Sequence, residues 1–226
     1  MNQPAPFQHR QAGWRTLLSS FLLCAAGCGV GGRPPADNRA FLLQVEPPAE
    51  GAGSPSVTIP LRIRNCRVAA PFVGRPLVYR LTTVQYQYDP YNAFLVPLGD
   101  QLDDALYRWL AAVAATPPDQ ALYVLEPYLE SLVADFTDPS RPLASARMRF
   151  LLTRSGPDGG RPSVVFQKTL VAKVRMSSGK PSGDQVVAAL SGCIQQILTE
   201  ARGILAAIPG PQAKKGDLGD VPLANE

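Results

Sequence analysis

The chain has 226 residues, of which 22 are basic and 18 acidic, and its formal net charge is +4. This length supports one domain with a proper core and is short for two, and the charge is too low for a typical nucleic-acid binder. The single histidine, His9, lies in a segment that we expect to be removed. A mature chain without histidine excludes histidine-dependent catalytic triads and offers no imidazole ligand to zinc or iron.

Residues 1–27 have the layout of a secretory signal peptide. Arg10 and Arg15 precede an apolar run over residues 17–26, which is much shorter than the roughly 20 residues of a membrane-spanning helix. The sequence AAGC at positions 25–28 resembles the bacterial lipobox, in which a signal peptidase cuts before the cysteine and acyl chains are attached to it. We therefore predict lipid attachment at Cys28. The alternative is an ordinary cleaved signal followed by a chance cysteine.

Residues 28–38 are rich in Gly and Pro and lack apolar periodicity, so we expect a flexible tether between the lipid and the domain. Gly29 stands where an Asp favours retention in the inner membrane of proteobacteria. In a double-membrane host, this predicts a lipid-anchored protein on the periplasmic side of the outer membrane.

Apolar residues at every second position predict strands over residues 40–45, 57–68 and 77–86. The third candidate is apolar on more than one side, which indicates a central position in the sheet. An aromatic loop is expected at residues 88–91 (YDPY). A repeat of three to four residues then predicts an amphipathic helix over residues 98–115.

The second half of the chain continues with strand candidates and one long helix. Strands are predicted over residues 121–125, 129–136, 143–153 and 163–176, with a hairpin loop at residues 155–160. The helix is predicted over residues 184–208, and Ser182 and Gln185 have capping-box spacing. We expect residues 209–226 to form a disordered tail. Residues 39–208 are thus predicted as a single α/β (α+β) domain, with two amphipathic helices packed on a largely antiparallel sheet.

The remaining cysteines, Cys66 and Cys193, lie in a strand pattern and on the apolar face of a helix. These positions favour two buried thiols. A disulfide is the alternative, since export places the chain in an oxidising compartment.

Motifs that could carry chemistry are weak. Ser177 and Lys180 have S-x-x-K spacing, but they fall in a turn, whereas that motif belongs at the start of a buried helix. Acidic residues that could pair are expected to be solvated on the first helix and on alternating strand positions: Asp100, Asp103, Asp104, Glu126 and Glu130. We therefore predict no catalytic residue, no metal site and no cofactor, and expect that the protein is not an enzyme.

Basic residues alternate with apolar ones in several strand candidates, for example at Arg62, Arg64, Arg147, Arg149 and Lys173. This spacing is typical of the solvated face of a sheet. The alternative is a patch that meets anionic lipid headgroups.

Aromatic side chains gather between the third strand candidate and the first helix. Tyr86, Tyr88, Tyr91 and Phe94 are more than a solvated loop requires. Tyr88, Tyr91 and Phe94 are our candidates for contact with a partner or a lipid. The alternative is a local plug over the end of the sheet.

Several stretches together resemble one family. They are residues 41–43 (FLL), 71–80 (PFVGRPLVYR), 91–97 (YNAFLVP) and 129–136 (LESLVADF), followed by the strand over 144–152 and the last helix. They are similar to the ABC-type transport auxiliary lipoproteins, which are encoded beside bacterial MCE-type lipid transporters. Phe94 stands where that family tends to have Trp.

This resemblance implies a non-enzymatic accessory component of an envelope lipid transport system. Its expected partners are an MCE-type protein, ABC permease components and the membrane, with no nucleic acid. The oligomeric state is left open, and a homo-oligomer is one option. Two other classes compete with this hypothesis: a structural or assembly lipoprotein of the outer membrane, and a secreted hydrolase that uses Ser177 or a carboxylate pair.

Overall fold

The computed structural model describes residues 38–47, 59–110, 121–156 and 160–209, all of which belong to one compact unit. The predicted signal peptide, Cys28, the tether up to residue 37 and the tail from residue 210 lie outside the described residues. Within the described ranges, no helix is both long enough and apolar enough to cross a bilayer.

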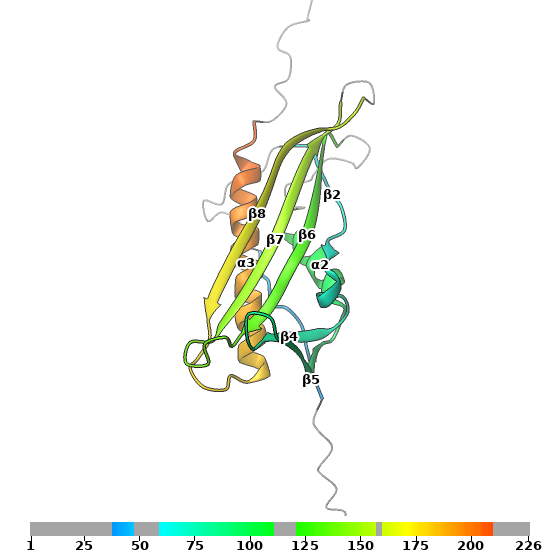
Figure 1. Ribbon diagram of the computed structural model, residues 1–226. Helices are drawn as coiled ribbons and strands as arrows, with labels where there is room; N and C mark the ends of the chain where they lie inside the picture. Colours follow the sequence, from blue (N-terminus) through cyan, green and yellow to red (C-terminus); the bar gives the residue numbers. More distant parts are fainter. Residues whose placement is uncertain (1–37, 48–58, 111–120, 157–159, 210–226) are drawn as a thin grey trace, which may run out of the picture. The chain divides into compact units, whose positions relative to one another are not determined.

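The unit is a mixed sheet with two α-helices, so the predicted α+β fold is confirmed (Figure 1). Its elements are β1 (Arg39–Phe41), β2 (Leu61–Ile63), β3 (Arg67–Val68), η1 (Ala70–Phe72), β4 (Pro76–Arg80), β5 (Tyr86–Phe94), α2 (Leu98–Leu110), β6 (Tyr123–Asp135), β7 (Leu143–Arg154), β8 (Ser163–Arg175) and α3 (Gly183–Ala206).

The strands follow the order β1-β5-β4-β6-β7-β8, and β2 and β3 also pair with β6. The long pairings β6–β7 and β7–β8 are antiparallel, which agrees with the predicted largely antiparallel sheet. The single strand predicted over residues 77–86 is wrong, because residues 81–85 form a turn between β4 and β5, which pair as an antiparallel hairpin. Three short strands, β2, β3 and β4, lie one after another along the other edge of β6 and are parallel to it. The strand predicted over residues 57–68 is therefore two short strands, with residues 64–66 between them.

Two strands predicted around Pro127 are one continuous strand, β6. Proline usually interrupts a central strand because it lacks an N–H. Here Arg64 N donates to Leu125 O and Ala69 N donates to Leu129 O, so odd-numbered residues of β6 direct their backbone groups toward β2 and β3. Pro127 faces the gap between those two strands, where no donor is needed.

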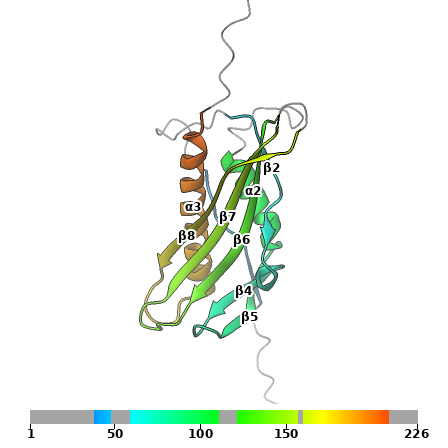
Figure 2. The ribbon, with the colours of Figure 1, turned by 45° about the horizontal axis from the view of Figure 1, so that its top comes forward.

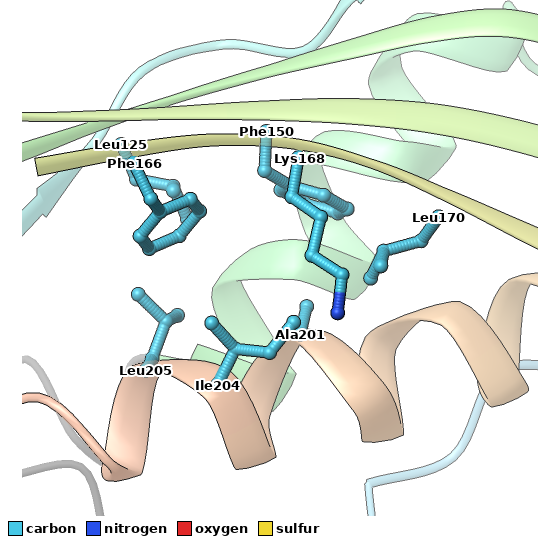
Figure 3. A pocket seen from close by; sticks show the side chains of 8 residues that line it. All are labelled: Leu125, Phe150, Phe166, Lys168, Leu170, Ala201, Ile204 and Leu205. Atoms are coloured by element: carbon cyan, nitrogen blue, oxygen red, sulfur yellow. The ribbon is translucent and has the colours of Figure 1, made fainter. Parts of the chain in front are cut away.

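The core lies between the sheet and the two helices. Helix α3 runs along β7 and β8 (Figures 1 and 2), and its residues Ile194 and Leu198 are fully buried, as predicted. Figure 3 shows the C-terminal half of this contact, where Ala201, Ile204 and Leu205 face side chains of the sheet. The crevice there has no room for a water molecule. Helix α2 buries one apolar face in the same core.

The start of α3 has the predicted capping box. Gln185 N donates to Ser182 Oγ, and Ser182 N donates to Gln185 Oε1, which satisfies backbone donors that the helix itself leaves without partners. Helix α2 ends its described part at Leu110, so the predicted extension to residue 115 lies outside the described residues.

Cys66 and Cys193 are buried free thiols rather than a disulfide. Burial raises the pKa of the Cys66 thiol to about 12 and that of Cys193 to about 11. Both side chains therefore stay protonated near neutral pH, and neither is an activated nucleophile.

Candidate functional site

The candidate contact residues lie on β5, which is a strand where the sequence predicted a loop. Val78 pairs with Tyr88 and Pro76 pairs with Ala93, so Leu77 alone lies opposite residues 89–92. These extra residues on β5 form a bulge, and bulges bend a strand and redirect its side chains. The strand continues beyond the bulge because β1 pairs with residues 92–94.

The carboxylate of Asp89 holds this bulge. It accepts hydrogen bonds from the backbone N–H groups of Tyr91 (2.8 Å) and Asn92 (3.0 Å) and from Asn92 Nδ2 (2.7 Å). The hydroxyl of Tyr79, on the neighbouring strand β4, also donates to Asp89 Oδ2. Asp89 therefore links residues within the bulge to one another and links the bulge to the neighbouring strand β4.

These contacts shift two pKa values in opposite directions. Burial alone raises the pKa of the Asp89 carboxyl, but the hydrogen bonds from Tyr79, Asn92 and the backbone lower it more, and the net result lies below the usual value. Burial, together with the adjacent carboxylate, raises the pKa of the Tyr79 hydroxyl. The pair is thus an ionised acceptor and a protonated donor near neutral pH, which is the arrangement that holds the bulge.

The structure separates the predicted aromatic residues into two groups. Tyr86, Tyr88 and Tyr91, named here the β5 tyrosines, are each more than half exposed. Phe94 is only 2% exposed and is a core residue, so the prediction that it contacts a partner is wrong. The plug interpretation holds for Phe94 and not for the β5 tyrosines.

An exposed apolar residue in the turn before β5 was not singled out from the sequence. Val84, in the turn between β4 and β5, has 86% of its surface exposed. No signal in the sequence identified it, because residues 77–86 were predicted as one strand.

The weak catalytic candidates do not come together. Ser177 and Lys180 are exposed in the turn between β8 and α3, as the sequence predicted. Among the acids of α2, Asp103 accepts a hydrogen bond from Cys66 N and Asp104 forms an ion pair with Arg108.

Two acidic residues of β6 also form ion pairs: Glu126 Oε1 lies 3.2 Å from Arg64 Nη1, and Glu130 Oε1 lies 3.7 Å from Arg149 Nε. Within the ranges that the structure describes, no group of three or more potential ligands could hold a metal ion.

Neither protein-family models nor curated proteins match this chain. Among solved structures, it is similar to protein XCC0632 from Xanthomonas campestris, of family DUF330, with 22% identity and a TM-score of 0.61 over 74% of this chain and 94% of that one. A second structure, described only as an uncharacterized protein, has 16% identity and a TM-score of 0.52 over 75% of this chain and 97% of that one. At these identities, the similarity establishes the fold alone.

Proposed function

We propose that this protein is a membrane-anchored periplasmic lipoprotein and an accessory component of an ABC/MCE-type envelope lipid transport system. In this proposal it works by binding partners, not by catalysis. The observation that carries the proposal is the set of three exposed β5 tyrosines, presented beside a bulge that Asp89 holds in place. Exposed tyrosines on a rigid support are typical of binding hot spots.

The position of the β5 tyrosines suits an anchored protein. Arg39, the first residue of β1, pairs with Asn92, which directly follows Tyr91. The preceding chain therefore joins the domain beside Tyr91. A lipid on Cys28 would be within roughly 40 Å of this point, since an extended chain spans about 3.3–3.6 Å per residue. Partners in or near the same membrane are then within reach of the β5 tyrosines.

The two specific parts of the proposal have separate support. The lipid anchor rests on the AAGC sequence at positions 25–28, and the transport system rests on the family resemblance of residues 41–205. Mass spectrometry of the membrane-extracted protein should find acyl chains on an N-terminal Cys28, and Cys28→Ala should release the chain or stall its processing. An unmodified Cys28 would contradict the anchor.

Copurification tests the binding role. The tagged full chain is recovered from membranes of its native host, and the associated MCE-type protein and permease are quantified. We expect Tyr88→Ala with Tyr91→Ala to lower their recovery at least tenfold, because single hot spots contribute about 2 kcal/mol or more. Tyr107→Ala is the matched control, since Tyr107 is 69% exposed on α2, away from β5. Unchanged recovery in the double variant, or no recovery with the wild type, would contradict the proposal.

A further inference from the structure

The sheet has one face that the helices leave open. Leu129 of β6, Met148 of β7 and Leu170 of β8 are buried on the helix side. Their neighbours in sequence point the opposite way, because side chains alternate along a strand. No helix of the described ranges packs on this second face, which is the near side of β6, β7 and β8 in Figure 1. We call it the open face.

An ordered stack of side chains lies in the middle of the open face. Arg67 of β3 pairs with Tyr128 of β6, which pairs with Arg149 of β7. Both guanidinium groups contact the Tyr128 ring, at 5.8 Å for Arg67 and 5.0 Å for Arg149 from the ring centroid. Glu130 lies 3.7 Å from Arg149 Nε. These contacts restrict the rotamers of both arginines before anything binds.

The open face is basic. Around the stack, β7 and β8 place further cations at exposed positions, namely Arg147, Lys173 and Arg175. Exposed Arg64, between β2 and β3, joins them through its ion pair with Glu126. The carboxylates of this face, Glu126, Glu130 and Asp135, each have an arginine partner. Cations therefore outnumber carboxylates here, although the whole chain has a net charge of only +4.

The open face is continuous with the β5 tyrosines. One row of paired residues crosses the sheet from Arg175 through Leu143, Asp135 and Arg80 to Tyr86. Asp135 and Arg80 form an ion pair within that row. A partner that binds the β5 tyrosines can therefore extend over the open face without crossing a helix.

We infer that the open face is a docking surface for an acidic protein surface, whose carboxylates bind Arg67 and Arg149 beside Tyr128. Planar guanidinium groups match carboxylates in geometry, and Arg and Tyr are enriched among binding hot spots. This inference goes beyond the proposed function, since it requires neither a lipid anchor nor a role in transport.

A protein fits this surface better than a lipid bilayer does. Glu126 and Glu130 lie among the cations, and a folded protein can place its own charges to match this mixed pattern. Arg67 and Arg149 lie against the Tyr128 ring instead of projecting toward headgroups. Val164 and Val171 are exposed apolar side chains of this face, and both lie on the edge strand β8 rather than around the stack.

The first test uses fluorescein-labelled poly-L-glutamate as the probe and the full chain in a nonionic detergent. Fluorescence anisotropy should show binding that weakens with salt, and Arg67→Gln with Arg149→Gln should weaken it about tenfold. The control, Arg161→Gln with Lys180→Gln, removes two positive charges from exposed positions outside the open face and should bind like the wild type. Absence of binding by the wild type, or equal losses in both double variants, would overturn the inference.

Two further measurements distinguish protein docking from a folding defect and from lipid binding. If the stack variant lowers the unfolding midpoint, Lys173→Gln with Arg175→Gln replaces it, because these exposed side chains lie on the edge strand β8. It should also weaken poly-L-glutamate binding several-fold, and wild-type affinity would count against the docking surface. Vesicles of phosphatidylglycerol and phosphatidylcholine form the second probe. If the open-face variants reduce vesicle binding and leave poly-L-glutamate binding unchanged, the face binds lipid and the inference fails.

Discussion

Replacing Asp89 by Ala should destabilise the domain and disturb the β5 surface together. The variant removes the acceptor for the Tyr79 hydroxyl, for Asn92 Nδ2 and for the backbone N–H groups of Tyr91 and Asn92. A buried group left without its partner costs about 1–3 kcal/mol. Because Tyr79 is half buried and the other donors are partly reached by water, we expect a total loss of about 2 kcal/mol.

Urea unfolding followed by circular dichroism measures this loss. Asp138→Ala is the matched control, because its carboxylate also holds a local turn, through Ser140, but is exposed and has no partner on another strand among the described contacts. Its effect should be much smaller. Tyr79→Phe should add little in the Asp89→Ala background, since the hydroxyl has already lost its acceptor. Equal losses for Asp89→Ala and Asp138→Ala would refute the role assigned to the bulge.

The same reasoning predicts a dependence on pH. The pKa of Asp89 is lower in the folded state than its ordinary value of 3.8, so its ionised form favours folding. This contribution is complete above about pH 5 and is lost as the pH falls through the ordinary value toward the folded one. The difference in unfolding free energy between wild type and Asp89→Ala should therefore shrink below pH 4, and a constant difference down to pH 2 would contradict the assignment.

Three further predictions concern the core, the thiols and the helix cap. Ile194→Ala and Leu198→Ala should each cost roughly 2–5 kcal/mol of unfolding free energy, and a loss below about 0.5 kcal/mol at both would mean that this face of α3 is not core. Cys66 and Cys193, with raised pKa values and buried sulfurs, should react with maleimide at pH 8 only in urea, as read by peptide mass spectrometry. Ser182→Ala should lower the unfolding free energy in urea by about 1 kcal/mol. The control Ser177→Ala, in the preceding turn, should leave it nearly unchanged.

Both helices could be predicted because their signals are local. The apolar repeat of α2 and the Ser182–Gln185 capping box of α3 lie within each segment and do not depend on distant pairing. The turn within the strand predicted over residues 77–86 was missed because its local signal is weak. Its sequence, LTTVQ at 81–85, lacks Gly, Pro, Asn and Asp, and it is closed by Leu81 N donating to Gln85 O (2.9 Å) and Gln85 N donating to Thr82 Oγ1 (3.0 Å).

The candidate site could be predicted in part. The clustering of aromatic residues indicated the region, but the bulge changes the alternation between Tyr88 and Phe94, so the sequence could not tell exposed from buried. The stack around Tyr128 was beyond prediction. Its arginines come from β3 and β7, and only the pairing of both strands with β6 brings them together.

Complementation of a strain that lacks this gene tests the central claim most directly, because it separates binding from chemistry in one measurement. With envelope lipid homeostasis as the readout, the variant Ser177→Ala with Lys180→Ala should restore function fully. Tyr88→Ala with Tyr91→Ala should fail, although it remains folded and membrane-bound. Loss of function in the first variant together with full activity in the second would contradict a role through surface contacts and would favour an enzymatic one.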